Sequence, residues 1–249
     1  MALGVRIHPN GSTKLLAKAE SLTRRVGAVF VRPAGSGQEQ RYQALRRRAS
    51  RELLDWLGDH DPLLGGGLVT QAIHEAARSL AGFDEETNGH QKRTAELSGG
   101  IGARLLLEGP RLRTLVTAAL LHDVGKLFVP KGLLIRPGPL TAEERKLVRD
   151  HSSKGEIWLR QRGVPGEVAA IVRWHHERWD GSGYPDRLSG EQIPLESRIL
   201  AVADAVDAMV SLRPYHPGRT LAEVRRILRE ESGGAFDPAV VEAAVSFWE

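Results

Sequence analysis

The sequence contains adjacent histidines and acids of the kinds that bind divalent metals. In "LLHDVGK", His122 and Asp123 end an apolar helical run that Gly125 then interrupts. In "IVRWHHE", a second apolar run ends in His175 and His176. Imidazole and carboxylate groups suit divalent transition metals, and at a helix end two neighbouring side chains can turn toward one point. Because the chain has no cysteine, any metal must be held by His, Asp and Glu.

Three further segments supply candidate ligands. Glu86 and His90 are four residues apart, a spacing that brings two side chains together on a helix. His151 follows "TAEERKLVRD" and is expected near the middle of a helix. Asp204 and Asp207 share one face of the apolar helix "RILAVADAVDAMV", where a carboxylate is costly unless it meets a metal or another cation. A surface position for Asp207 is the alternative interpretation.

Each of these signals is weak by itself. A chance histidine beside a helix-capping acid, or an exposed acid–imidazole pair, would produce the same local patterns. Their combination indicates two closely spaced divalent ions, an arrangement that activates water and clamps the oxygens of a phosphoryl group. Lys126 follows the His-Asp pair closely enough to contact a phosphate or to protonate a leaving oxygen. The residues alone therefore predict a metal-dependent phosphohydrolase.

A glycine-rich turn, "DGSGYPD", comes directly after the paired histidines. Gly181 and Gly183 permit backbone angles that other residues resist, so the chain can pass close to a ligand and present amide donors to phosphate. Pro185 restricts the exit of the turn, and Tyr184 is expected to pack against the preceding helix. An ordinary tight turn is the alternative, but Gly181 lies only five residues after His176, which favours a role at the same site.

The helices that must position these residues appear as apolar residues at helical spacing from about residue 40 onward. Capping boxes are expected at residues 141–144 and 220–223, a helix starting at Asp237-Pro238, and a break between helices at residues 163–165. Residues 1–39 differ, with short strands expected at residues 5–7 and 26–31. We therefore expect a mainly α protein. Residues 65–249 would form a helical domain, and residues 1–64 a small N-terminal module with a linker helix and no assigned role.

Composition limits the class of protein. The 249 residues are 41% hydrophobic, which is enough for a packed core. The net charge of +4 is small and the aromatic fraction is only 5%, so clusters such as Arg46–Arg48 are interpreted as solvated helix faces. No nucleic-acid polymer is expected as a partner. No apolar run approaches a membrane span and no secretory signal is visible, so a cytoplasmic location is the expectation.

The order and spacing of these motifs resemble the HD-GYP family, a branch of the HD superfamily of metal phosphohydrolases. The resemblance runs from about Asp84 to Phe247, roughly two thirds of the chain. Its motifs are "ETNGHQKR", "LLHDVGK", "RPGPLTAEE", the lone His151, "HHERWDGSGYP", "IPLESRILAVADAVDAM", "RPY" and "FDPAVV". The resemblance implies an all-helical bundle of the HD type. It also implies hydrolysis of the bacterial second messenger cyclic di-GMP to pGpG, GMP or both, by a metal-activated water.

The resemblance further implies roles for individual residues. Asp123 would bridge two ions and help to hold the attacking water, Lys126 would contact the substrate, and Arg213 of "RPY" would contact a guanine or a phosphate. The implied cofactors are two or three divalent ions, iron or manganese, and a homodimer or a signalling protein is a further hypothesis for partners. The implied metal ligands are His122, Asp123, His151, His175, His176 and Asp204, with Glu86 and His90 completing a third site. The substrate cleft would be lined by Asp180, Gly181, Gly183, Tyr184 and Pro185.

Two positions depart from the family pattern. Gly89 stands where an asparagine is frequent, and His216 follows "RPY" where Arg or Lys is frequent. A neutral His216 would weaken one substrate contact, so the preferred nucleotide stays open. Two alternatives remain beside cyclic di-GMP hydrolysis. One is a phosphohydrolase of the same fold that acts on another cyclic dinucleotide or nucleotide. The other is a non-catalytic module that senses the messenger or docks a partner, against which the complete ligand set argues.

Overall fold

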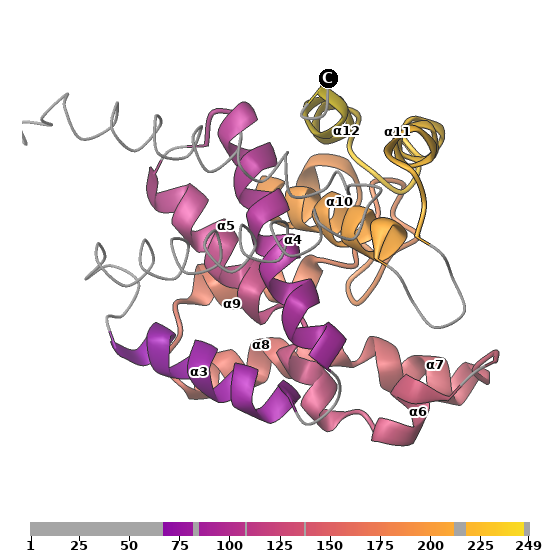
Figure 1. Cartoon of the computed structure of the whole chain (residues 1–249). Coiled ribbons are helices and arrows are strands. Elements are labelled where there is room, and N and C mark those ends of the chain that lie inside the picture. Colours follow the sequence, from indigo (N-terminus) through magenta and orange to yellow (C-terminus); the bar gives the residue numbers. More distant parts are fainter. Residues whose placement is uncertain (1–66, 82–84, 108, 137, 212–217, 247–249) are drawn as a thin grey trace, which may run out of the picture.

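The computed structural model describes residues 67–81, 85–107, 109–136, 138–211 and 218–246, which form helices and their connections (Figure 1). Within these ranges the β-structure is confined to an isolated bridge between Ser232 and Phe236. The expected mainly α fold is confirmed. The N-terminal module of residues 1–64, with its expected strands and linker helix, lies outside the described residues.

The helices succeed one another through short connections. In chain order they are α3 (Gly67–Ala81), α4 (Glu85–Arg104), α5 (Gly109–Leu121), η1 (Val124–Phe128), α6 (Lys131–Ile135), α7 (Ala142–Arg149), α8 (His151–Gln161), α9 (Gly166–Trp174), η2 (Gly190–Gln192), α10 (Leu195–Val210), α11 (Leu221–Glu230) and α12 (Pro238–Val245). None of the helices in the described part of the chain is both long enough and apolar enough to cross a membrane.

Local capping signals fix several of these boundaries. The hydroxyl of Thr141 accepts from the amide of Glu144 at 3.2 Å, and the Glu144 carboxylate accepts from the amide of Thr141 at 2.8 Å. The second expected capping box starts α11 in the same way. Asp237 accepts from the amide of Ala239 at 2.8 Å, which caps α12 ahead of its first residue, Pro238. These start signals are confirmed because each depends only on residues within one turn.

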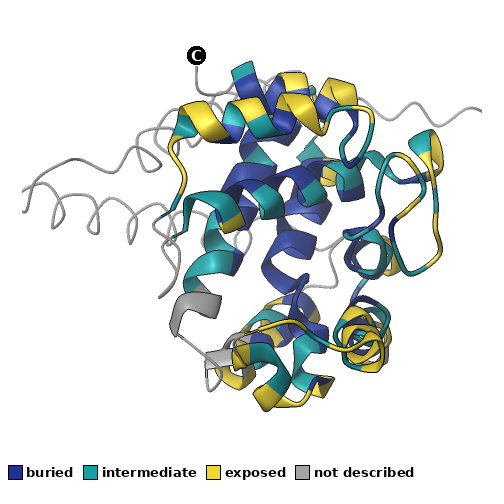
Figure 2. Ribbon diagram, turned by 90° about the vertical axis from the view of Figure 1, so that its right-hand side faces the viewer, coloured by how far each residue is buried: buried dark blue, intermediate teal, exposed yellow. Residues whose placement is uncertain are grey.

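The core lies where α4 packs along α5 and against α10, and buried residues concentrate along these three helices (Figure 2). Leu97, Leu115 and Leu200 are fully buried there. Burial of each such side chain stabilises the fold by about 1.5–3 kcal/mol. Gly102 lets α4 approach α5, because a Cβ at that position would lie 2.9 Å from Leu112. The three helices form a rigid frame that carries candidate ligands on α4, after α5 and on α10.

A second tight contact joins η1 to the start of α8. A Cβ on Gly125 would lie 1.8 Å from the carbonyl oxygen of His151 and 2.6 Å from the amide nitrogen of Gly155. No side chain fits in that space, so the backbones touch only because residue 125 is glycine. The contact holds Asp123, just before η1, close to His151.

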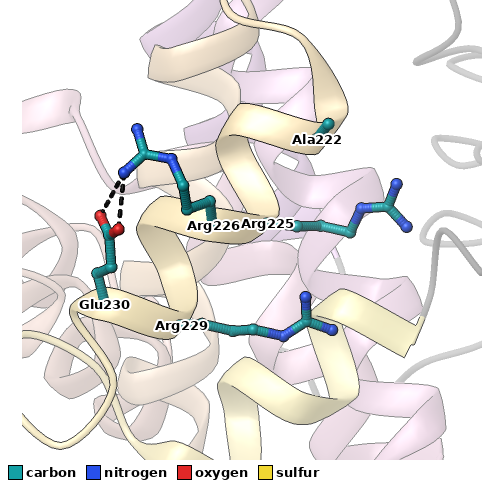
Figure 3. Close-up of a pocket in the computed structure, with 5 residues that line it drawn as sticks. All are labelled: Ala222, Arg225, Arg226, Arg229 and Glu230. Atoms are coloured by element: carbon teal, nitrogen blue, oxygen red, sulfur yellow. Dashed lines mark hydrogen bonds and ion pairs between the residues drawn. The ribbon is translucent and has the colours of Figure 1, made fainter.

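Helices α11 and α12 pack on α10, with Val224 and Leu228 of α11 turned inward and fully buried. On the outer side of α11, Arg226 donates to Glu230 at 2.7 Å, and Arg225 and Arg229 extend from the same helix (Figure 3). The turn between α11 and α12 also reaches the segment after α9. Its Gly234 and Ala235 carbonyls accept from the amides of Asp180 and Trp179.

Candidate metal centre

The predicted ligands whose side chains the structure describes lie together in two adjacent groups. The candidate ligand atoms within each group all lie within 4.8 Å of one another. The rings of His122 and His175, one from each group, have centroids 5.2 Å apart. We call them the imidazole group, which consists of His151, His175 and His176, and the mixed group, which consists of His90, His122 and Asp204.

Helix ends bring several of these residues inward. Helix α5 ends just before His122, and His175 is the C-cap of α9. His151 is the first residue of α8, so its predicted position near the middle of one helix is wrong. Asp150, which separates α7 from α8, keeps right-handed helical angles (φ −61°, ψ −13°). The break therefore leaves no Gly or Pro signal in the sequence, and the periodic pattern runs through it.

Three of the histidines are oriented by the backbone. His122, His151 and His175 each place Nδ1 against the carbonyl oxygen of the residue three positions earlier, at 2.7, 2.6 and 2.6 Å. A carbonyl can only accept, so Nδ1 carries the hydrogen in each case and the lone pair resides on Nε2. The Nε2 atom of His122 is buried and has no hydrogen-bond partner among the described residues. Such an arrangement is typical of metal-binding histidines.

Asp123 spans the two groups. Its Oδ1 lies 3.7 Å from His151 Nε2, while its Oδ2 lies 3.5 Å from His122 Nε2 and 3.8 Å from His90 Nε2. Lys126 Nζ donates to Oδ2 at 2.6 Å. Burial would raise the pKa of Asp123, but Lys126 and the surrounding histidines hold it well below its usual range. An ionised carboxylate therefore faces both groups at once.

Acids surround His90 on both sides of its ring. Nδ1 lies 2.7 Å from Asp207 Oδ2, and Nε2 lies 3.1 Å from Asp204 Oδ1. Arg93 pairs with Asp207, which is fully buried, so the alternative surface position for Asp207 is wrong. Burial would lower the pKa of His90, but hydrogen bonds to Asp204 and Asp207 raise it to about 10. Burial would raise the pKa of Asp204, but the hydrogen bond from His90 helps to hold it far below its usual range.

The imidazole group is neutral at physiological pH. Burial lowers the pKa of His151 and, more strongly, that of His175. Burial together with the neighbouring His151 lowers the pKa of His176 to about 3. A neutral imidazole is the form that binds a metal ion.

These groups fit divalent transition metals. The candidate donors are imidazole nitrogens and carboxylate oxygens. Hydrogen bonds of the Nδ1 atoms fix the ring orientations. The carboxylates concentrate negative charge in a buried space. Burying ionised carboxylates beside unpaired lone pairs is costly unless a cation is bound there. The donor set can therefore hold a pair of neighbouring ions.

The glycine-rich turn folds back onto the end of α9. A Cβ on Gly183 would lie 2.4 Å from the amide nitrogen of Arg178, and the amide of Tyr184 donates to the carbonyl of His176 at 3.2 Å. The peptide bond between Tyr184 and Pro185 is cis. The Tyr184 ring lies 4.9 Å, centroid to centroid, from the ring of His176, so Tyr184 packs just past the end of α9, where packing against the helix itself was expected. The turn therefore forms a wall beside the imidazole group.

An arginine lies beyond this wall. The guanidinium carbon of Arg149 lies 5.1 Å from the centroid of the Tyr184 ring, a cation–π contact. Arg149 is exposed and forms no ion pair among the residues that the structure describes. Lys126, which pairs with Asp123, is partly exposed. Two cations therefore lie near the site, Arg149 against Tyr184 and Lys126 against Asp123.

Some predicted residues are not placed. The side chain of Glu86, in the first turns of α4, and the whole of Arg213 lie outside the described residues. Of residues 180–185, Tyr184 contacts the His176 ring, Gly183 is buried, and Asp180 is exposed and pairs with Arg178. Sequence reasoning missed Arg93, Arg149 and Glu177. The three-residue spacing from His90 to Arg93 was a usable signal, whereas nothing local marked the other two.

Comparisons with known proteins agree with this arrangement. The family described as "HD domain" matches residues 76–240. The cyclic di-GMP phosphodiesterase response regulator RpfG of Xanthomonas campestris is 38% identical over 175 residues, covering 70% of this chain and 46% of its own length. The 3'3'-cGAMP-specific phosphodiesterase 2 of Vibrio cholerae is 34% identical over 181 residues, covering 72% of this chain and 35% of its own length. The chain thus spans less than half the length of both relatives.

A solved structure shares the fold. Bd1817, an HDGYP protein from Bdellovibrio bacteriovorus, superposes with a TM-score of 0.56 at 16% identity, covering 93% of this chain and 72% of its own. At this identity the likeness concerns the arrangement of helices and not the chemistry.

Proposed function

The chain belongs to the HD domain family, and from this premise we propose that it is a metal-dependent phosphodiesterase that hydrolyses cyclic di-GMP. The observation that carries the proposal is the position of Asp123, whose two oxygens face the imidazole group and the mixed group separately. Relatives named as cyclic di-GMP phosphodiesterases support the substrate class. The products would be pGpG, GMP or both.

Iron or manganese is the proposed metal, with two ions in the two groups, and Glu86 with His90 would complete a third site. Bound divalent ions would supply a Lewis acid and lower the pKa of water. The ring orientations imposed on His122, His151 and His175 would present their Nε2 atoms to these ions without rearrangement.

Asp123 and Lys126 are the proposed catalytic pair. The ionised Asp123 would accept a hydrogen bond from the attacking water and orient it. Lys126 already donates to Asp123 at 2.6 Å, and its partial exposure leaves it able to contact a phosphate oxygen or to protonate the leaving oxygen. When Lys126 protonates the leaving oxygen, the alcohol product would carry that proton, and the proton lost by the attacking water would restore the charge of Lys126.

The wall of residues 180–185 is the proposed substrate-binding element. Asp180, Gly181, Gly183, Tyr184 and Pro185 would line one side of the bound nucleotide, and Arg213 would contact a guanine or phosphate. Arg149 and Lys126 place positive charge beside the metal groups, which suits a substrate with two phosphates. Electrostatic attraction would also speed the arrival of an anionic ligand.

A second candidate substrate is 3'3'-cGAMP. The relative of this specificity in Vibrio cholerae is 34% identical to the chain, close to the identity of the cyclic di-GMP enzymes. His216 also replaces the cation that the HD-GYP pattern often has after "RPY". Both observations concern the contacts to a base or a phosphate and leave the metal groups unchanged.

The organisation of the chain completes the proposal. Residues 65–249 would form the phosphodiesterase domain, and residues 1–64 a separate small module. A homodimer or a signalling protein is the proposed kind of partner, with a cytoplasmic location. None of these four assignments affects the chemistry of the site.

One experiment tests the proposal. The full chain is purified without chelators or oxygen, its metal content is measured per chain, and iron- or manganese-loaded protein is mixed with cyclic di-GMP, 3'3'-cGAMP and cyclic di-AMP. We expect about two ions per chain and cleavage of cyclic di-GMP, detected by chromatography. Faster cleavage of 3'3'-cGAMP would favour the second candidate. No turnover of any nucleotide would overturn the enzymatic proposal.

A further inference from the structure

Glu177 is a buried acid with an unusual set of partners. It follows His176 directly and is only 3% exposed. Oε1 accepts from the amide of Asp186 at 2.7 Å, and Oε2 accepts from the amide of Leu188 at 3.1 Å. No cationic side chain pairs with it in the part of the chain that the structure describes. A buried carboxylate without a counter-ion is costly, so its contacts with the backbone of residues 186–188 must account for its presence.

These two contacts close a loop. Residues 178–188, which we call the substrate loop, start after Glu177, three residues past the end of α9, and return to the same residue. The loop has no helix of its own, and it is also attached through backbone pairs of Trp179 and Asp180 with the turn before α12 and through side-chain contacts of Asp186. Glu177 directly follows His176 of the imidazole group. Its hydrogen bonds therefore hold residues 186–188, the end of the loop, near that group.

The outer side of the loop is held differently. Asp186 accepts from Arg173 Nε and from Trp174 Nε1, each at 2.7 Å. Asp186 is exposed, and a contact of this kind is weakened by solvent. The Glu177 contacts are partly buried, so solvent weakens them less than it weakens the contacts of Asp186. The loop's Tyr184, which contacts the His176 ring, is set by the same contacts.

We propose that Glu177 is a positioning residue that fixes the substrate loop, and with it Tyr184, at a set distance from the imidazole group. Glu177 binds neither metal nor substrate. The role assigned to the loop rests on the proposed phosphodiesterase function, whereas the attachment of the loop by Glu177 does not. Release of this attachment would let the wall move away from the metal groups without removing any ligand.

The test compares Glu177→Gln and Glu177→Asp with Glu191→Gln in the full chain. Glutamine keeps the size of the side chain, but its NH₂ group cannot accept from a loop amide. Aspartate keeps both acceptors on a shorter stem and should rescue part of the effect. Glu191 is an exposed acid of η2, close in sequence to the loop, and serves as the matched control.

Three readouts are required. By amide hydrogen exchange, the Asp186 and Leu188 amides should exchange about tenfold faster in Glu177→Gln, as expected for the loss of one buried hydrogen bond. Metal content per chain should stay unchanged. In the active enzyme, KM for cyclic di-GMP should rise about tenfold while kcat changes less than about threefold, the pattern of a lost binding contact. Glu191→Gln should match the unaltered chain in each measurement.

Unchanged exchange at residues 186 and 188 would overturn the proposal. Loss of metal in Glu177→Gln would overturn it as well, because Glu177 would then act on the ligands and not on the loop. The exchange measurement needs no turnover. If the unaltered chain cleaves no nucleotide, the phosphodiesterase function fails while the attachment of the loop is still decided.

Discussion

Asp207 orients His90 across 117 positions of sequence, with its Oδ2 2.7 Å from the Nδ1 of the ring. The same oxygen accepts from Arg93 Nη2 at 2.9 Å, so the carboxylate is fixed from two directions. Because Nδ1 is directed to Asp207, the Nε2 atom faces Asp204 and the rest of the mixed group. Asp207 therefore supports the candidate ligand His90 from the side opposite to the mixed group.

Asp207→Asn should weaken metal binding at the mixed group. The amide keeps the shape of the side chain but removes the charge behind His90 and leaves Arg93 without its buried partner. Metal affinity should fall about tenfold to a hundredfold, the usual effect of losing such a contact. Titration of the metal-free protein with manganese measures it. Ser211→Ala removes a hydroxyl that contacts Arg93 and donates to Asp207, but it leaves the carboxylate in place, so the affinity should change far less than in Asp207→Asn.

Asp123→Ala should abolish hydrolysis and lower the metal content. The substitution removes the carboxylate that faces both groups, and it leaves Lys126 beside buried histidines without its anionic partner. Metal analysis and product chromatography measure the two effects on one preparation. An Asp123→Ala protein that keeps full activity would show that the site has been assigned wrongly.

Gly125→Ala should disrupt the site from a distance. The new methyl group would lie 1.8 Å from the carbonyl oxygen of His151, so η1 and α8 must separate. Overpacking of this kind costs about 1–3 kcal/mol or more, and it displaces His151 from Asp123. We expect a lower melting temperature and reduced metal content. Gly132→Ala is the control, since a Cβ there meets nothing within 4 Å, and it should be neutral or slightly stabilising.

Arg149→Ala should raise KM with little effect on kcat. The guanidinium forms a cation–π contact with Tyr184 and no ion pair among the described residues, so it is available to an anionic substrate. Loss of one charge-assisted hydrogen bond corresponds to about a tenfold rise in KM. Lys146→Ala removes the same charge from an exposed position on the same helix. An equal rise in KM for both variants would assign the effect to overall charge.

The sequence was most informative where structure depends on neighbours in the chain. Thr141, Thr220 and Asp237 start helices as predicted, because each cap uses only residues within one turn. The paired His-Asp and His-His motifs were recognisable for a similar reason. Residue type and position at a helix end together restrict what such side chains can bind.

Relations between distant segments were not predictable in the same way. The division of the ligands into two groups depends on how α4, α5 and α10 pack, and helical spacing alone does not specify packing partners. The burial of Asp207 depended on Arg93 from another helix. The role of Glu177 depended on a loop that returns to it, and the start of α8 at His151 left no local signal.

The hydrogen bonds from Nδ1 of His122, His151 and His175 to backbone carbonyls have a consequence for how this site can change over time. Carbonyl acceptors are present whatever side chain occupies those positions. Ring orientation is therefore inherited from the helix ends and survives substitution of Ala119, Val148 or Val172 by other residues of compatible size. Natural variation can then change the carboxylates and the substrate loop, and with them metal preference and substrate choice, while the imidazole rings keep their orientation.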